Sequence, residues 1–342
     1  MKKEIFIFLF FLFLSLILAE LILRALMPSS YTYDKKYGWA RSKPDILKLT
    51  IPDRANATSN VTVTYYQFGF KRFGNITSNR TKMFIVGDSF TEMAFISNGE
   101  EWYSYIEKEF NNTELFVYGT GGFGSLQEYI VLDDYIDKIK PDIILWQFYF
   151  NDFINNDYQS DLGEYPLGNF AYRPYLENGE IVYRLPLPMS FFREHSKIID
   201  LSLKIYDQFE KRKMENDKRL FFAKIYGENY WNRNFEDSLI FKGSFDRVLK
   251  TTSDVFLLAR KRAGKTPIYL FSADSRLEKA EKYITSQSNI TYISGVSQYI
   301  QDMKDDGYRP FVVNDGHWNF EGNRLVGEFL ADYFRKEQIL KS

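Results

Sequence analysis

The chain has 342 residues and is 45% hydrophobic, which is enough apolar material for one large domain or two smaller ones. Its 44 basic and 45 acidic residues leave a formal charge of -1, so composition gives no support to a nucleic-acid partner. The chain contains no cysteine, which excludes disulfides, thiolate metal sites and cysteine nucleophiles.

The N-terminal segment has the composition of a membrane-spanning helix. Residues 5–27 are predominantly apolar, Glu20 and Arg24 are their only charged residues, and Pro28 ends the run. A helix of about 20 residues spans the hydrocarbon core of a bilayer. Glu20 and Arg24 stand four residues apart, so they can pair on one face of such a helix. We therefore predict a membrane anchor over residues 1–28.

The charges before the apolar run predict the orientation of this segment. Lys2 and Lys3 favour a cytoplasmic N-terminus, which leaves the body of the protein outside the cytoplasm. A signal peptide cleaved after Ala19 is the alternative, and it would make the protein secreted. We favour the retained anchor because the apolar character continues beyond Ala19.

Residues 29–80 are polar and loop-like, and we interpret them as an extracytoplasmic linker or N-terminal extension. The whole chain holds six Asn-x-Ser/Thr sequons, and four of them crowd into this segment. They begin at Asn56, Asn60, Asn75, Asn79, Asn111 and Asn289. This pattern supports a glycosylated surface, and an asparagine-rich loop without glycans is the alternative.

The stretch from Met83 to Phe95, MFIVGDSFTEMAF, is the most informative part of the chain. A short apolar run breaks at Gly87, Asp88 and Ser89 and then takes on helical character. This is the sequence form of a strand-to-helix turn in an α/β sheet. Such a turn exposes the serine hydroxyl beside helical N–H groups that lack partners, which is a suitable place for a nucleophile.

After this turn, helices and nearly continuous apolar strands alternate along the chain. We predict strands at 113–118, 142–150, 266–273 and 290–294, and helices at 98–110, 126–139 and 324–336. This rhythm predicts an α/β domain over residues 81–342, with a parallel sheet and helices on both faces. Ser89, Gly119 and Asn151 each follow a different strand, so they should meet at the carboxyl edge of the sheet.

Residues 153–265 interrupt the alternation and are predicted to be an insertion. Asn178 and Gly179 favour a type I′ turn, which predicts a hairpin around them. Amphipathic helices are expected at 196–222 and 244–263. The insertion would form a cap over the carboxyl edge, either as a lid that selects substrate or as a packed extension.

The residues at this edge suggest nucleophilic catalysis. A serine at neutral pH needs a base within hydrogen-bond reach, and a carboxylate that fixes the tautomer of that base. His317, with Asp315 two residues before it, meets both needs. Negative charge on a carbonyl oxygen calls for N–H donors, which the backbone of Ser89 and Gly119 and the Asn151 side chain can supply.

Each of these residues also has a purely structural interpretation. Asp315 can cap the following turn, Asn151 can end a strand, and Gly119 can serve the backbone alone. A lone histidine such as His317 is usually structural, but the order of the set favours chemistry. His195, the other histidine, has no partner at metal-binding spacing, and we interpret it as structural. We predict neither a metal nor a cofactor.

The same residues carry a family resemblance. The blocks around Ser89, Gly119, Asn151 and His317 resemble the four blocks of the SGNH, or GDSL, hydrolase superfamily. The last block is similar to the DGHWN signature of membrane-anchored members. The resemblance implies a flavodoxin-like three-layer α/β/α sandwich. It also implies a triad of Ser89, Asp315 and His317, with Ser89, Gly119 and Asn151 as the oxyanion hole.

The chain departs from the family pattern at two positions. Tyr149 stands where the third block usually has a glycine, two residues before its asparagine. Asn314 stands where many members place the acidic residue, three before the histidine. These departures concern the shape of the oxyanion loop and the identity of the triad acid.

The predicted function is that of a membrane-anchored, extracytoplasmic serine ester hydrolase that works through an acyl-enzyme. By resemblance, the substrate is an O-acyl ester, with the O-acetyl group of a surface glycan as first candidate. An O-acetyltransferase with the same triad, an enzyme for lipid esters, and a catalytically inactive glycan-binding or structural surface protein are the alternatives. The expected partners are the ester substrate and the membrane, with no nucleic acid.

Overall fold

The computed structural model describes residues 2–26, 32–41, 44–54, 57–158, 161, 172–184, 195–202, 205, 242–274, 278–313 and 315–341. Three predictions lie outside these residues. They are the sequon asparagine Asn56, the position of Asn314, and most of the helix expected at 196–222.

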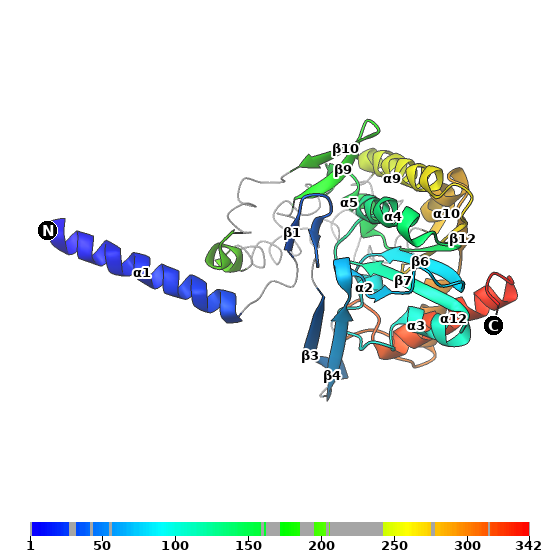
Figure 1. Ribbon diagram of the computed structural model, residues 1–342, viewed down its shortest axis with the longest axis horizontal. Coiled ribbons are helices and arrows are strands. Elements are labelled where there is room, and N and C mark those ends of the chain that lie inside the picture. Colours follow the sequence, from blue (N-terminus) through cyan, green and yellow to red (C-terminus); the bar gives the residue numbers. More distant parts are fainter. Residues whose placement is uncertain are drawn as a thin grey trace, which may run out of the picture.

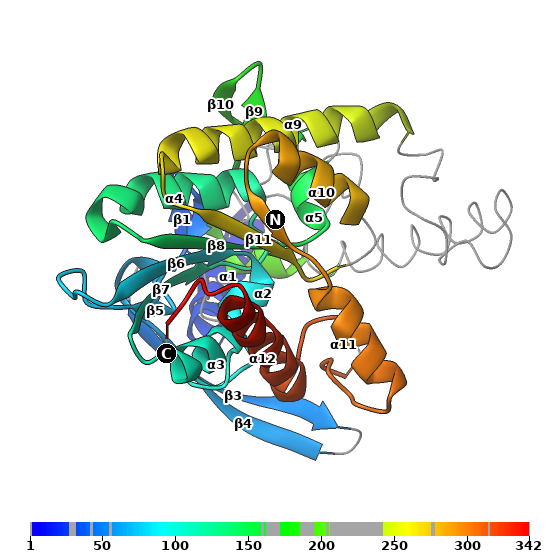
Figure 2. The same cartoon turned by 90° about the vertical axis from the view of Figure 1, so that its right-hand side faces the viewer.

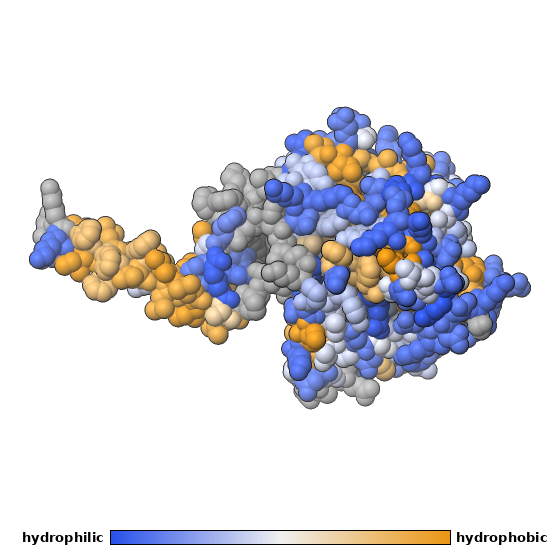
Figure 3. All heavy atoms as spheres, in the orientation of Figure 1, coloured by the Kyte–Doolittle hydropathy of each residue, from blue (hydrophilic) through white to orange (hydrophobic). Residues whose placement is uncertain are grey.

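The N-terminal helix α1 (Lys2–Leu26) projects from the body of the protein (Figure 1). Its apolar side chains are exposed along its length (Figure 3), and it is long and apolar enough to cross a membrane. The expected pairing on one face is confirmed, because Arg24 Nε donates to Glu20 Oε1 at 2.8 Å. A long apolar helix at the N-terminus is therefore present, and its role as an anchor remains a prediction.

A six-stranded sheet forms the centre of the body, in the order β12-β11-β8-β6-β7-β5. Its strands are β5 (Arg72–Phe73), β6 (Thr81–Gly87), β7 (Thr113–Gly119), β8 (Ile143–Phe148), β11 (Ile268–Ser272) and β12 (Thr291–Ile293). All neighbours are parallel except β5, which runs antiparallel to β7. The five parallel strands, numbered along the chain, follow the order 2-1-3-4-5 of flavodoxin-like folds. This confirms the predicted fold.

Helices cover both faces of the sheet, which makes three layers (Figure 2). One face carries α4 (Ser125–Ile139), α9 (Lys242–Ala263) and α10 (Glu278–Gln287); the other carries α3 (Trp102–Glu109), α11 (Val296–Asp305) and α12 (Phe320–Lys336). The alternation along β6 shows why both layers are needed. Phe84 and Val86 enter one buried cluster while Met83 and Ile85 enter the other.

The expectation that the segment before β6 is loop-like is wrong. It contains β1 (Thr32–Asp34), β2 (Gly38–Ala40), β3 (Asp45–Arg54), β4 (Ala57–Tyr65), the short helix η1 (Gln67–Gly69) and β5. The long hairpin of β3 and β4 is antiparallel. Within residues 59–65 of β4, the part whose burial is described, Val61, Val63 and Tyr65 are buried at every second position, and polar residues stand between them. That alternation gives a low overall hydrophobicity, which obscured the strand.

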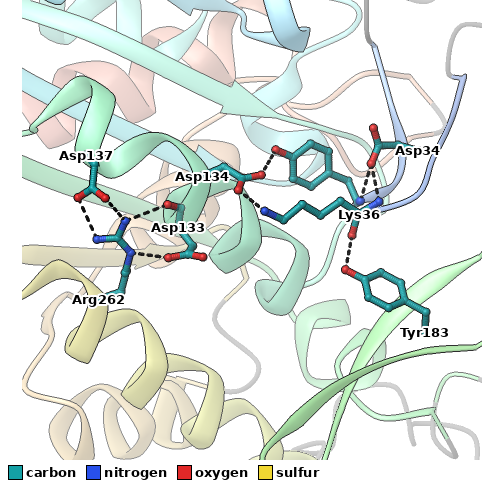
Figure 4. Close-up of polar contacts among 8 residues, drawn as sticks. Asp34, Lys36, Asp133, Asp134, Asp137, Tyr183 and Arg262 are labelled. Carbon is teal, nitrogen blue, oxygen red and sulfur yellow. Dashed lines mark hydrogen bonds and ion pairs between the residues drawn. The ribbon is translucent and has the colours of Figure 1, made fainter.

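The N-terminal extension is fastened to α4 by polar contacts (Figure 4). The side chains of Lys36 and Tyr37 both donate to the carboxylate of Asp134. Tyr183 OH, from the far hairpin, donates to the Lys36 carbonyl at 3.0 Å. On the other side of α4, Arg262 of α9 bonds to Asp133 and Asp137. Residues far apart in the sequence therefore meet along one helix.

The predicted insertion contains both a hairpin and part of the sandwich. Strands β9 (Arg173–Glu177) and β10 (Glu180–Arg184) pair antiparallel, and Asn178 and Gly179 have φ values of 52° and 83°. Positive φ at both turn residues confirms the expected type I′ hairpin. Helix α9 packs into the buried cluster beneath α4, so it belongs to the helical layer. The chain thus rejoins the sandwich before residue 265.

Candidate active site

Ser89 lies at the turn between β6 and the short helix α2 (Ser89–Glu92). Asp88 caps this helix by accepting from the Phe90 N–H at 2.9 Å. As the first helical residue, Ser89 has an N–H with no intrahelical acceptor. Gly87 leaves room for the buried Thr91 and Gln147 side chains, because a Cβ at this position would lie 2.3 Å from Thr91 Oγ1. The predicted strand-to-helix turn is confirmed.

The structure brings Ser89, His317 and Asp315 into one hydrogen-bonded line. His317 Nε2 lies 2.7 Å from Ser89 Oγ, and His317 Nδ1 lies 2.5 Å from Asp315 Oδ1. The same carboxylate oxygen accepts from the His317 backbone N–H at 2.9 Å. The imidazole is thus oriented so that one nitrogen faces the hydroxyl while the other is held by an acid.

The surroundings of the Asp315 carboxyl favour its ionised form. Partial burial raises the pKa of its carboxyl, but the hydrogen bonds from His317 outweigh burial and leave that pKa below its ordinary value. A carboxylate beside Nδ1 stabilises a proton on the imidazole. Asp315 is therefore the carboxylate that holds His317 Nδ1, two residues before the histidine.

The residues on either side of His317 form hydrogen bonds that hold its loop in place. Asn319 caps α12 by accepting from the Gly322 N–H at 3.1 Å, and its amide donates to the carbonyls of Arg309 and Phe311. The His317 carbonyl accepts from the Val312 N–H at 2.9 Å. These bonds fix the loop on both sides of the histidine, so its position depends little on the side chain itself.

Aromatic rings surround the imidazole but leave it accessible. The Phe90 ring centroid lies 4.7 Å and the Phe95 centroid 5.6 Å from that of His317. Tyr149 packs on the other side of Phe90, at 4.8 Å. The His317 side chain remains 25% exposed, which leaves a path for a substrate.

Gly119 ends β7 directly against α2. It pairs in register with Gly87, and a Cβ at Gly119 would lie only 2.3 Å from the Glu92 backbone nitrogen. Only glycine permits this approach, because the clash would be with main-chain atoms. Gly119 is therefore placed against the short helix that Ser89 begins, and a packing requirement explains the glycine as well.

Asn151 begins α5 (Asn151–Asn155) immediately beyond the end of β8. Its Nδ2 donates to the Phe123 carbonyl at 3.3 Å, which links the third block to the loop after β7. A side-chain amide carries two N–H groups, so one of them is not used in this bond. Tyr149 does not prevent this turn, because its N–H is held by the Asp152 carboxylate at 2.9 Å.

Three buried carboxyls interact beneath these turns. Burial raises the pKa of Asp88 to about 6 and raises those of Glu128 and Asp152 well above their ordinary range. Glu128 accepts from Trp146 Nε1. No sequence pattern singles out Glu128, because a charged residue in an amphipathic helix normally faces water.

Beside the histidine loop lies a groove with a volume of about 790 Å³. It runs between the β3–β4 hairpin, the segment after α2, and the loop between α11 and α12. Its wall mixes aromatic and polar side chains: Phe95, Tyr308, Phe311, Phe320, Asn60, Ser97, Glu100 and Arg309. Phe95, which lines the groove, packs edge-on against the His317 ring, so the groove begins next to His317.

His195 is separate from this set. Its main-chain carbonyl accepts from Arg24 Nη2 of α1 at 2.7 Å. Within the described part of the chain, no group of three histidine, cysteine or acidic residues is arranged to hold a metal ion.

Comparisons with known proteins give only distant structural similarity. No protein-family model and no curated protein sequence matches the chain. It is similar to a member of the lipolytic G-D-S-L family from Veillonella parvula, with TM-score 0.41, 14% identity, and coverage of 75% of this chain and 98% of the other. It is also similar to LAE5, an alpha/beta hydrolase from the metagenome of Lake Arreo, with TM-score 0.39, 12% identity, and coverage of 78% of this chain and 99% of the other.

A third similarity is to Axe2, an acetylxylan esterase from Geobacillus stearothermophilus, with TM-score 0.36, 11% identity, and coverage of 76% of this chain and 95% of that one. At this level of similarity no function is transferred, so the chemistry of the site must come from its own side chains.

Proposed function

We propose that the protein is a serine ester hydrolase of the SGNH type that works through an acyl-enzyme. The observation that carries this proposal is the hydrogen-bonded line from Ser89 Oγ through the His317 imidazole to Asp315. A hydroxyl, an imidazole and a carboxylate in this order have the geometry of an activated serine nucleophile.

The proposed reaction has two steps. Ser89 Oγ attacks the ester carbonyl carbon while His317 Nε2 takes its proton, and the alcohol then leaves with that proton. Water next attacks the acyl-enzyme, with His317 again as base, which releases the acid and frees Ser89. Asp315 stabilises the protonated imidazole throughout.

The oxyanion hole is proposed to consist of three donors. They are the backbone N–H groups of Ser89 and Gly119 and the second N–H of the Asn151 amide. Support comes from the close approach of Gly119 to α2 and from the bond that orients Asn151. Each such donor contributes roughly 10² to 10³ in rate in serine hydrolases.

The substrate is proposed to be an O-acyl ester of a glycan, with acetyl as the acyl group. The groove beside His317 combines aromatic faces with polar side chains, which suits a hydroxyl-rich ligand better than a lipid chain. A sugar hydroxyl that replaced water in the second step would make the same site an O-acetyltransferase. The DGHWN resemblance also favours a membrane-anchored enzyme, with α1 in the bilayer and the catalytic body outside the cytoplasm.

Labelling with a fluorophosphonate probe tests the proposal. Wild type should be labelled, Ser89→Ala should not, and His317→Ala should be labelled at least about 10³-fold more slowly. His195→Ala, the matched control, should be labelled at the wild-type rate. A folded wild type that resists the probe would instead support an inactive glycan-binding protein.

Acetate release from acetylated glycans and acetylated lipids then separates the substrate classes. We expect release from glycans by wild type and none by Ser89→Ala. Transfer to an added oligosaccharide, measured by mass spectrometry, distinguishes the acetyltransferase from the hydrolase.

A further inference from the structure

The loop at the end of β7 comprises residues 119–122, with the sequence GTGG. We call it the GTGG loop. Both main-chain polar groups of its Gly121 form hydrogen bonds to side chains. The Gly121 N–H donates to Glu92 Oε2 at 2.6 Å, and the Gly121 carbonyl accepts from Trp39 Nε1 at 3.0 Å. Glu92 belongs to α2, whereas Trp39 belongs to β2 in the N-terminal extension. The orientation of this residue is therefore set from two separate elements.

A third element completes the contacts of the GTGG loop. Arg173 of β9 donates from Nη2 to the Gly122 carbonyl at 2.8 Å. Its guanidinium also lies 4.9 Å from the centre of the Trp39 ring. The two side chains that bind the loop carbonyls thus support each other.

Glu92 connects the loop to the extension in a second way. It is 2% exposed, and its other oxygen, Oε1, accepts from Tyr65 OH at 2.8 Å and from Arg41 Nε at 3.1 Å. The Arg41 guanidinium lies 3.9 Å above the Tyr65 ring. Both residues lie before β6, so a single carboxylate joins the nucleophile helix, the GTGG loop and the N-terminal extension.

A second basic side chain, Lys71, interacts electrostatically with Glu101 and with this carboxylate. Lys71 is fully buried, and its Nζ lies 4.7 Å from the Tyr65 ring. No hydrogen-bond partner of Nζ is found in the part of the chain that the structure describes. Together with Arg41 it favours a carboxylate over a neutral amide at position 92.

We propose that Glu92, held by Arg41 and Tyr65, is a positioning residue that fixes the GTGG loop so that the Gly119 N–H points at the oxyanion. The proposal rests on the esterase function proposed above. Gly119 is the first residue of this loop and touches the Glu92 backbone. A misplacement of about 1 Å can cost about 10²-fold in rate. The extension is then part of the catalytic apparatus, not a linker to it.

Glu92→Gln tests this positioning role, because glutamine has nearly the same shape as glutamate. The amide has one acceptor oxygen, so it cannot accept from both Gly121 and the Tyr65–Arg41 pair. We expect kcat for a small acetyl ester to fall about 10- to 100-fold with KM within about twofold, and fluorophosphonate labelling to slow equally. Hydrogen exchange in a peptide covering residues 119–124 should become faster.

Glu281→Gln and Tyr292→Phe are matched controls. Tyr292 OH donates to Glu281 Oε2 at 2.7 Å, so a half-buried tyrosine and a buried glutamate form another such pair, without a hydrogen bond to the GTGG loop. At neutral pH both controls should keep wild-type kcat and wild-type exchange in residues 119–124.

Trp39→Phe is the second variant, in case Glu92→Gln does not fold. It removes the N–H donated to the Gly121 carbonyl together with one of the two indole rings, and it should lower kcat by about tenfold. Unchanged kcat in folded Glu92→Gln, or an equal loss in the controls, would overturn the positioning role. Failure of wild type to react with the probe would count against the esterase function instead.

Discussion

Asp315 holds one ring nitrogen of His317 and thereby decides which nitrogen faces Ser89. In Asp315→Asn the amide can hold the imidazole in the wrong tautomer and no longer stabilises its protonated form. We expect kcat for ester hydrolysis to fall by about 10³ to 10⁴ with little change in KM. Steady-state hydrolysis of a chromogenic acetate measures both.

Asp305→Asn is the control for this change, because Asp305 is an exposed carboxylate at the end of α11. It should retain wild-type kinetics. Full activity in Asp315→Asn would mean that another group orients the histidine.

Gly119 gives a second prediction at the residue scale. In Gly119→Ala the new methyl group would meet the backbone of α2 at 2.3 Å, so the end of β7 must move away from Ser89. We expect at least about a 10²-fold loss of labelling rate together with a lower Tm. Gly264→Ala, where a Cβ would meet nothing within 4 Å but φ is +59°, should cost about 1–2 kcal/mol and leave labelling intact. Equal labelling of the two variants would contradict the prediction.

Much of the site could be predicted from residue types and their order. Ser89, His317 and Asp315 supply the hydroxyl, imidazole and carboxylate that nucleophilic catalysis by serine needs. Each stands at a strand end or before a helix. Glu92 and Trp39 could not be predicted in this way. Their importance comes from a buried contact to Gly121, which depends on how the N-terminal extension folds back over the sheet.

At the scale of elements, the start of α12 is joined to the start of α3 by Asn323. This buried amide accepts from the Trp102 N–H at 3.0 Å and donates to the carbonyls of Asn319 and Trp318. Asn323→Ala would leave buried backbone groups without partners, so we expect a loss of about 2–4 kcal/mol in the free energy of unfolding. Urea unfolding measures it.

The same variant should loosen the histidine loop, because Trp318 follows His317 directly. A fall in labelling rate is therefore expected as well. Gln301→Ala, on the exposed side of α11, removes a surface amide and should change the unfolding free energy by less than about 0.5 kcal/mol. Comparable losses in the two variants would argue against the role of Asn323.

Elements with continuous apolar runs were predictable, and elements with mixed patterns were not. β7, β8 and β11 are buried on both faces, and their sequences show it. In β4, threonine and asparagine alternate with valine, and the contacts of the hairpin with Phe95 and Ser97 explain its place beside the groove. Helix α12 begins at Phe320, four residues before its predicted start, because Asn319 caps it.

At the scale of the whole molecule, a buried acid makes stability depend on pH. Burial raises the pKa of Glu281 to about 8, although Tyr292 and Ser272 donate hydrogen bonds to it. The unfolded chain ionises this group near its ordinary pKa of about 4.5. The contribution of the protonated acid is therefore complete below about pH 4.5 and is lost as the pH rises through 8.

Glu281→Gln removes this dependence. The unfolding free energy of wild type should fall relative to the variant between pH 5 and 8, by at most about 1.4 kcal/mol per pH unit. Urea unfolding across this range measures the difference. Parallel curves for the two proteins would mean that Glu281 is already ionised in the native state at pH 5.

The two outer strands of the central sheet are short. β5 has two residues and β12 has three, whereas an open edge needs a longer row of free N–H and C=O groups to recruit a further strand. A chain held at high density on a surface meets copies of itself constantly. We expect the sheet to resist amyloid-like growth under such crowding, because each edge offers a newcomer only two or three residues to pair with.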